Sequence, residues 1–407
     1  MHVSELKGSK LRKIEPNVHL KISLSIIYHV GTWLPQDNFR CVYIVYTIFS
    51  FTFILGIFLM TEIANFFVHC NDPAKIMAGA TILMTNSTHA FKALRFQVLI
   101  ILSRQKRIQA LLDITKGTLF SRNNVAYERI VTYYTWQGIF HHIAYQSFGT
   151  MAILCWGFTP IADFLAGRSR QLPMEGWYPY NVTDTPAFEI TSLHQIIAII
   201  IACFHNVAMD TLVTGLITVA CCQLTLLNHN IASIKNEANE HEETVEKNSD
   251  KPYEELKLCV KHSNEIYGFS NEIQDIFGSV IFLQFLVNCI IICLIAFNIT
   301  QMKIYIPSVL IGMLMYMCCM TYQIFIYCWH GNELYLHSIS VLFAAYSNDW
   351  WHANKRFKQA LQFAMTRIQR PLTLCAGNVM LLSLHTFVRI LRMSYSIFTV
   401  LQSSTTS

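Results

Sequence analysis

Seven long apolar stretches run through the chain, and shorter polar segments separate them. A helix that crosses about 30 Å of hydrocarbon needs roughly 20 apolar residues, and each stretch reaches that length. The pattern therefore predicts an all-α membrane protein with seven transmembrane helices in one domain that covers residues 1–407. The spans are expected near residues 41–67, 76–101, 131–159, 191–227, 277–298, 304–328 and 371–401.

Two polar regions carry a helical pattern of their own. Val18 to Val30, within the N-terminal segment 1–40, is amphipathic and too short to span, which predicts an interfacial helix. A basic amphipathic helix is expected from Asn354 to Arg370, after a break at residues 347–351. The last span would then open at Pro371.

Helical spacing also continues past the ends of spans four and five. Apolar residues recur at helical intervals from Leu256 to Phe277, which predicts one helix from near Tyr253 into span five. Span four is expected to run on to Ile234, with loosely ordered acidic residues at 236–250. An apolar stripe outside the bilayer needs a cover, so these extensions are expected to pack together and form a subunit anchor. The alternative is that they are ordinary helix extensions with no partner.

The composition agrees with a membrane protein. The chain is 53% hydrophobic and 14% charged, with a mean hydropathy of +0.37, whereas soluble chains have about 25% charged residues. The net charge of +5 is explained by basic loops that face anionic lipid, and no nucleic-acid partner is expected.

Basic residues lie mostly on one side of the predicted membrane. Of the 30 lysines and arginines, the spans hold Lys92, Arg95, Arg389 and Arg392. The segments on one side hold only Lys75, Arg168, Arg170 and Lys303, and the other side holds all the rest. Cytoplasmic loops are enriched in lysine and arginine. The distribution therefore predicts a cytoplasmic N-terminus and an extracellular C-terminus.

The loop between spans three and four bears on the same question. Asn181 begins an N-glycosylation sequon there, which fits an extracellular loop. None of the 13 cysteines lies in residues 160–190, so no disulfide can join this loop to span three. No Asp-Arg-Tyr sequence follows span three. These features and the orientation argue against a G-protein-coupled receptor.

No set of side chains indicates catalysis, a metal site or a cofactor. His141 with His142, and Cys328 with His330, do not complete a four-ligand zinc set. No nucleophile, base and oxyanion donors can be assembled, so no enzyme activity is expected. Asp210 and Glu62 are acids well inside spans, and such groups are functional candidates. The alternative for Asp210 is a buried hydrogen bond that fixes helix packing.

Several motifs resemble the insect odorant receptor family. Gln323 to Leu334 (QIFIYCWHGNEL), followed by Ser338, Ala344 to Tyr346 and Trp350, is similar to the family signature around span six. Arg370 to Gly377 and Arg389 to Leu401 are similar to the family's last span, and Asp210, Leu172-Pro173 and Trp177 to Pro179 also match. The chain is short, with a compact loop between spans four and five, and so resembles a ligand-tuned subunit rather than the shared co-receptor.

The resemblance implies a tetrameric odorant-gated cation channel that assembles with the co-receptor in the plasma membrane of olfactory neuron dendrites. It places a pocket for small volatile odorants in the outer half of the helix bundle. Such a site is a concave apolar pocket with a few polar groups. The candidate ligand-binding residues on spans two, three, four and six are Thr81, Met84, Thr85, Thr88, Tyr145, Phe148, Met151, Trp156, Ile199, Ile200, Phe204, Tyr305, Val309, Met313 and Tyr316.

The last span is the candidate pore helix. Arg392, Tyr395, Thr399 and Gln402 share one helical face. An arginine that faced lipid would cost about 2.5–3.5 kcal/mol, so this face favours a water-filled pore or another subunit. Thr399, Val400 and Leu401 fall near the family's hydrophobic gate. Snorkelling or pairing with an acid is the alternative for Arg389 and Arg392.

Two other receptor classes remain as alternatives. A gustatory receptor of the related channel family would carry a Thr-Tyr start and a Gln-Phe end in its final helix. This chain instead has Ser394-Tyr395 and Gln402-Ser403 at those places. A G-protein-coupled receptor is the other alternative and is disfavoured by the orientation.

Overall fold

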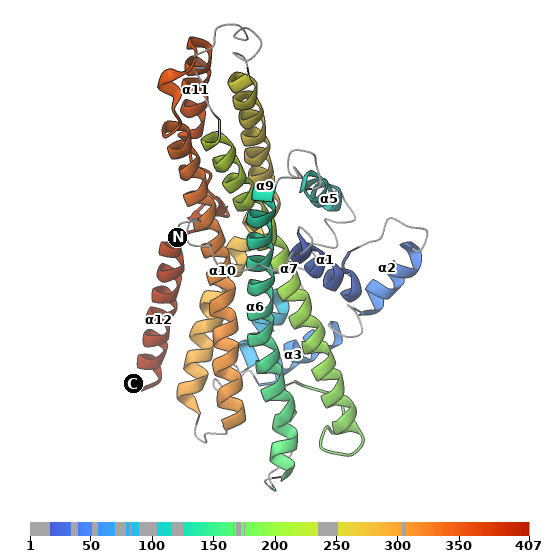
Figure 1. The fold of residues 1–407 in the computed structure, drawn as a ribbon. Helices are drawn as coiled ribbons and strands as arrows, with labels where there is room; N and C mark the ends of the chain where they lie inside the picture. Colours follow the sequence, from blue (N-terminus) through green and yellow to red (C-terminus); the bar gives the residue numbers. More distant parts are fainter. Residues whose placement is uncertain are drawn as a thin grey trace.

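The computed structural model is built almost entirely of helices, and several run the length of the molecule (Figure 1). It describes residues 17–33, 40–50, 56–69, 79–81, 83–88, 104–115, 125–165, 167, 172–174, 176–234, 251–302 and 307–406. The labelled elements are α1 (Val18–Val30), α2 (Arg40–Phe49), α3 (Ile57–Val68), α5 (Arg104–Thr115), α6 (Val125–Leu165), α7 (Ala187–Ala232), α9 (Lys251–Gln301), α10 (Pro307–Tyr346), η3 (Trp350–His352), α11 (Lys355–Ile368), β1 (Cys375–Ala376), β2 (Met380–Leu381) and α12 (Leu384–Thr406).

Four of the described helices, α6, α7, α9 and α10, are long and apolar enough to cross a membrane. They pack against one another, and α7 contacts α1, α6, α9 and α10. An unbroken run of buried residues covers α7 from His205 to Gln223. A helix that is apolar on every face is stable only when neighbours surround it. The all-α architecture predicted from the sequence is confirmed, with α7 at its centre.

The predicted spans can be placed on these elements. Residues 131–159 lie in α6, 191–227 in α7 and 277–298 in α9, and the helix that holds most of 304–328 continues to Tyr346. Span 41–67 falls on α2 and α3, with 51–55 outside the described residues. In the span at 76–101, residues 79–81 and 83–88 are helical, and the others lie outside the described part of the chain.

The start of the last span differs from the prediction. The helix begins at Leu384 rather than at Pro371, and a short antiparallel hairpin of β1 and β2 precedes it. Gly377 and Asn378 form the turn with φ angles of 59° and 58°, a conformation that favours Gly and Asn. The apolar residues Leu372, Leu374 and Ala376 are buried against the protein rather than in lipid. Hydropathy does not distinguish burial in protein from burial in lipid. The predicted start of the last span at Pro371 was therefore too early.

Side chains of α9 and α10 hold this hairpin in place. Gln274 accepts a 2.7 Å hydrogen bond from the Cys375 N–H and donates one of 2.6 Å to its carbonyl. Ser338 Oγ accepts from the Leu372 N–H at 3.0 Å. Backbone groups away from water must find partners inside the protein, and these side chains supply them. The hairpin therefore fixes where α12 begins.

The predicted helix extensions are present. The described helix α9 begins at Lys251 and runs unbroken to Gln301, while α7 continues to Ala232. The two helices pack together, and α11 lies against α9 and α10 at the same end (Figure 1). The acidic residues 236–250 lie outside the described part of the chain.

Helix α1 has the predicted bounds, and one of its faces is buried in the bundle. His19, Leu20, Ser23 and Ile27 are buried, and the helix contacts α6 and α7. A Cβ atom at Gly215 would stand 2.8 Å from Leu20 Cδ2. A side chain at this position would have to displace Leu20, so glycine favours the close approach of α1 to α7.

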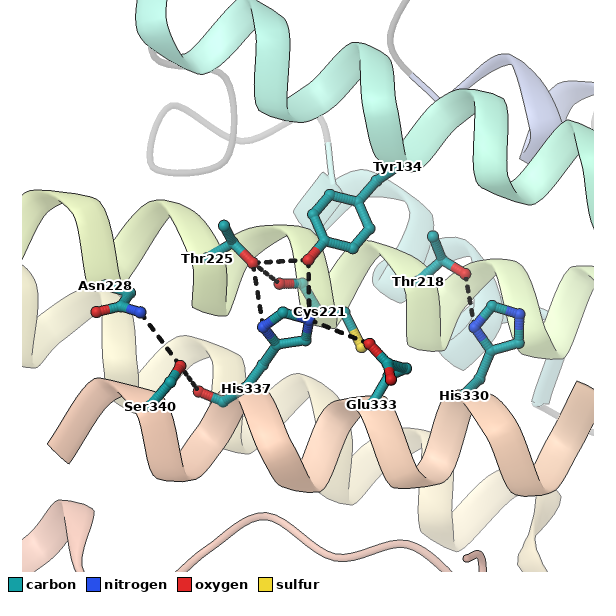
Figure 2. A network of polar contacts seen from close by, with 9 residues as sticks. All are labelled: Tyr134, Thr218, Cys221, Thr225, Asn228, His330, Glu333, His337 and Ser340. Carbon is teal, nitrogen blue, oxygen red and sulfur yellow. Dashed lines mark hydrogen bonds and ion pairs between the residues drawn. The ribbon is translucent and has the colours of Figure 1, made fainter. Parts of the chain in front are cut away.

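Polar side chains between α7 and α10 keep the two helices in a fixed parallel register (Figure 2). Thr218 contacts His330 at 3.3 Å and Thr225 contacts His337 at 3.4 Å. Asn228 donates to Ser340 at 3.2 Å, and all three pairs are separated by the same 112 residues. Tyr134 of α6 joins this row, with its hydroxyl 2.8 Å from Thr225 and 3.0 Å from His337. Sliding either helix would break all of these contacts together.

Candidate functional site

A small, largely apolar cavity of about 70 Å³ lies inside the bundle. Its walls come from α6, α7 and α10, with Thr85, Asn86 and, from the loop between α6 and α7, Met174 completing the lining. The lining residues are Thr85, Asn86, Gly149, Ala152, Ile153, Trp156, Met174, Ile199, Ala202, Cys203, Asn206, Val207, Tyr316, Cys319 and Met320.

The space results from small residues that recur on facing helices. Gly149 and Ala152 face the cavity from α6, while Ala202 and Cys203 face it from α7. Cys319 takes the equivalent place on α10. Close-packed interiors leave few voids, so these small side chains on three neighbouring helices account for the cavity.

Aromatic and hydroxyl groups define one side of the cavity. The rings of Trp156 and Tyr316 meet edge to face, with centroids 5.3 Å apart. The hydroxyl of Tyr316 is hydrogen-bonded to that of Thr85. Asn86, one residue further along, donates a 2.7 Å hydrogen bond to Glu62 of α3. The cavity therefore combines apolar walls with a few fixed polar groups.

The loop between α6 and α7 covers part of this cavity. Gln195 of α7 accepts a 3.1 Å hydrogen bond from the Met174 N–H and donates one of 3.1 Å to its carbonyl. The same amide donates to the Tyr178 hydroxyl at 3.0 Å. Burial raises the pKa of Tyr178 above that of a free phenol, so the hydroxyl stays protonated. Met174 is thus held over the cavity by a fully buried glutamine.

A buried polar cluster begins at the cavity wall. The Asn206 amide donates to the Tyr145 hydroxyl at 3.0 Å, and that hydroxyl donates to Asp210 Oδ2 at 3.2 Å. Asp210 is 2% exposed and also accepts from Tyr327 at 2.9 Å and from Gln323. Of the two interpretations of Asp210, the hydrogen bonds support the one in which it fixes helix packing.

The cluster continues to α9. Gln323 Oε1 accepts from the Asn288 amide at 2.8 Å and from the Gln284 amide at 3.1 Å. Cys289, next to Asn288, accepts a 3.3 Å hydrogen bond from Ser394 of α12. Side chains from α6, α7, α9 and α10 therefore meet in one network, and α12 is bonded to the helix at its far edge.

Some candidate ligand residues meet around the cavity and others support it. Thr85, Trp156, Ile199 and Tyr316 line it. The supporting residues lie behind that lining: Met84, Phe148 and Met313 pack on the core, Tyr145 belongs to the Asp210 cluster, and Thr81 and Thr88 are buried.

Other candidates do not line the cavity. Met151 is 48% exposed, Ile200 38% and Phe204 37%, so these side chains point away from the bundle. Val309 is partly buried but takes no part in the lining. Tyr305 lies outside the described residues.

Helical spacing from the candidates that line the cavity leads to several further lining residues that were not predicted from the sequence. From Trp156, steps of three, four and seven residues lead to Ile153, Ala152 and Gly149. From Ile199, steps of three, four and seven lead to Ala202, Cys203 and Asn206. Most of the predicted ligand-binding residues are large or aromatic, whereas a cavity forms where side chains are small.

The candidate pore residues lie on the outward face of α12. Ser394 and Ile390 are buried against the bundle, whereas Arg389, Arg392, Tyr395, Thr399, Val400 and Gln402 are exposed. Leu401 is partly buried. Figure 1 shows α12 standing at the edge of the other helices.

Within the described residues, no group of three or more His, Cys, Asp and Glu side chains is arranged to hold a metal ion. His141 instead contacts the Tyr322 hydroxyl at 2.8 Å, and His142 contacts Thr211 at 2.9 Å. The described cysteines are free thiols, and Cys328 is buried. These side chains therefore serve packing and hydrogen bonding between helices.

The four long apolar helices are those of a multi-pass membrane protein. The family profile described as 7tm Odorant receptor matches residues 80–395, and the chain belongs to that family. It is therefore an odorant receptor and not an enzyme.

Known receptors match over most of the chain. Odorant receptor Or1 of Anopheles gambiae is 27% identical over 410 residues, across 94% of each chain. Odorant receptor 22b of Drosophila melanogaster is 24% identical over 74% of this chain and 70% of its own. The solved structure of the olfactory receptor OR5 from Machilis hrabei in complex with eugenol matches with a TM-score of 0.77 and 18% identity, over 95% of this chain and 99% of that one. This last match shows a shared fold.

Proposed function

We propose that this receptor is a subunit of an odorant-gated, non-selective cation channel that acts with a shared co-receptor. The observation that carries this proposal is the cavity between α6, α7 and α10, whose wall is hydrogen-bonded to a cluster that reaches α9. A small volatile molecule binds in the cavity, and binding favours the open state through its higher affinity for that state.

The Asp210 cluster supports a link between the cavity and the last helix. Asn206 lines the cavity and is two hydrogen bonds from Asp210, through Tyr145. Gln323 joins Asp210 to Asn288 on α9, and α12 packs along α9. A ligand that moves α7 or α10 must rearrange these buried bonds, because each polar group needs a partner.

The outward face of α12 supports its role as the pore helix. Arg389 and Arg392 are exposed on this helix, and exposed arginines are costly in lipid. Tyr395, Thr399, Val400, Leu401 and Gln402 follow toward its end, where we place the gate. Four such helices around an axis would turn this face toward water.

The opposite end of the molecule supports assembly with the co-receptor. Phe363 of α11 is 80% exposed, next to a groove between α9 and α11 that Leu256 and Val260 line. Large exposed apolar side chains mark interaction surfaces when they cluster. This end, formed by α7, α9, α10 and α11, is the proposed subunit anchor of a heterotetramer.

Charge supports an orientation with the anchor in the cytosol. Helix α11 carries Lys355, Arg356, Lys358 and Arg367, and it lies at the opposite end of the bundle from the loop with Asn181 (Figure 1). Basic segments favour the cytoplasmic side. The cavity lies toward the outer end, where odorants arrive at the plasma membrane of a sensory dendrite.

The test is whole-cell current from cells that express this chain with the co-receptor, while volatile compounds are applied and GTP-dependent signalling is blocked. The proposal predicts that odorant-evoked current persists under the block and is absent when either subunit is omitted. Current that disappears under the block would refute the channel mechanism.

A further inference from the structure

A buried carboxyl group lies beside the odorant cavity. Glu62 of α3 is 4% exposed, and its Oε1 atom accepts a 2.7 Å hydrogen bond from Asn86 Nδ2. Asn86 is part of the cavity lining. Within the part of the chain that the structure describes, Glu62 Oε2 is buried and has no hydrogen-bond partner. One acceptor of this carboxyl group is therefore unused, directly behind Asn86, a residue that lines the cavity.

An isolated buried carboxyl group is costly to the folded protein. Transfer of an ionised carboxylate out of water is unfavourable unless a cation or several donors replace the water. The hydroxyls of Thr85 and Tyr316, two other polar groups of the lining, are bonded to each other. The single bond from Asn86 satisfies one oxygen only. A ligand that brings positive charge and N–H donors to this corner would meet that need.

We propose that the Asn86–Glu62 pair binds the ammonium group of a small primary amine, whose hydrocarbon part fills the apolar cavity. This inference rests on the proposed function, in which the cavity is the odorant site. An ammonium group has three donors, and both Glu62 Oε2 and the amide oxygen of Asn86 are acceptors. The ammonium–carboxylate pair is neutral as a whole, whichever atom holds the proton, so it can be buried where one charge alone cannot.

Other classes of volatile ligand fit this corner less well. Ethers, esters and ketones have no donor for the unused oxygen, and carboxylic acids bring a second negative charge. An alcohol offers one donor and no charge, and a hydrogen bond between neutral partners is weaker than one assisted by charge. The apolar lining accepts the hydrocarbon part of all these ligands equally. The functional group that meets the Asn86–Glu62 pair therefore determines which class of ligand binds best.

The experiment uses the full chain co-expressed with the co-receptor. A graded series of primary aliphatic and benzylic amines is applied, each with the alcohol and the methyl ether of the same carbon skeleton. The variants are Glu62→Gln, which keeps an acceptor for Asn86, and Glu189→Gln at the exposed start of α7 as a control. Surface labelling confirms that each variant reaches the membrane.

Wild-type channels are expected to respond to amines at concentrations about tenfold or more below those of the matched alcohols and ethers. Glu62→Gln should remove this advantage and leave the ether responses unchanged, while Glu189→Gln has no effect. The inference is overturned if no amine is favoured in the wild type, or if Glu62→Gln keeps the amine advantage.

A further variant distinguishes failure of the amine proposal from failure of the proposed function. Ala202→Phe fills the cavity itself. If it removes the responses to all compounds while Glu62→Gln changes no ratio, the cavity is the odorant site and the amine assignment is wrong. If Ala202→Phe leaves every response unchanged, the cavity assignment itself is wrong.

Discussion

Small side chains account for the central cavity of this receptor. Gly149, Ala152 and Ala202 leave space where larger residues of the same helices would fill it. The sequence predicted Trp156 and Tyr316 because large aromatic groups stand out in an apolar helix. It did not predict their small neighbours, because glycine and alanine also occur in a span wherever two helices pack closely. Only the packing of three helices at one level shows which small residues border a void.

Asp210 illustrates how a buried charged residue acts through its partners. Replacing it by asparagine keeps its shape but gives the Tyr145, Tyr327 and Gln323 donors one acceptor oxygen instead of two. Asp210→Asn should therefore destabilise the folded receptor by about 1–3 kcal/mol. Thermal unfolding of the purified complex measures this change. The control Asp275→Asn alters a side chain that is 70% exposed and should shift the midpoint little; equal shifts for the two variants would argue against the buried cluster.

At the scale of elements, long helices were predictable and the hairpin was not. The apolar and helical patterns of α6, α7, α9 and α10 persist over many turns, and the long extensions of α7 and α9 follow from them. The segment before α12 has a similar hydropathy, because Leu372 and Leu374 are buried against protein. Gln274 and Ser338, which satisfy its backbone, are distant in sequence, so no local pattern reveals them.

A close approach between α10 and this segment gives a prediction about glycine. A Cβ atom added to Gly331 would stand 2.6 Å from the Leu382 carbonyl oxygen, where the backbone cannot move freely. Gly331→Ala should therefore cost roughly 1–3 kcal/mol of stability and displace the start of α12.

A matched control exists on α9. At Gly268 an added Cβ would have no neighbour within 4 Å, so Gly268→Ala should be neutral or stabilise the helix by up to about 1 kcal/mol. The comparison is the amount of folded receptor at the cell surface together with the unfolding temperature. A tolerated Gly331→Ala would contradict the packing of the hairpin on α10.

At the scale of the whole molecule, the sequence predicts the orientation through charge, and the structure adds where the ends of the helices lie. The loop that carries Asn181 and the end of α12 lie toward one end of the bundle, and α11 lies at the other (Figure 1). The faces proposed to meet another subunit could not be chosen from the sequence, because in one chain they look like any exposed surface.

Glycosylation tests the orientation. Asn181 is exposed, and its side-chain oxygen accepts a 2.8 Å hydrogen bond from the Thr183 hydroxyl. We expect a glycosidase-sensitive decrease in gel mobility that Asn181→Gln abolishes and the sequon-preserving Val182→Ala retains. A wild-type receptor whose mobility no glycosidase changes would weigh against an extracellular loop.

The anchor gives a second prediction at this scale. Phe363→Glu places a charge on the exposed apolar side chain of α11 and should reduce co-purification of the co-receptor by about half or more. Gln359→Glu adds the same charge at another position of α11 that is not buried and should leave the complex intact. Equal recovery with both variants would place the subunit contact elsewhere.

The central claim is that an odorant in the cavity between α6, α7 and α10 opens the channel. The most direct measurement is the concentration–response curve for an activating volatile, recorded for Ala202→Phe and Ile200→Phe with the co-receptor. Ala202 lines the cavity, and Ile200, two residues earlier, points away from it. The account predicts that Ala202→Phe raises the half-maximal concentration about tenfold or more, while Ile200→Phe leaves it unchanged. The same curve for both variants and the wild type would contradict it.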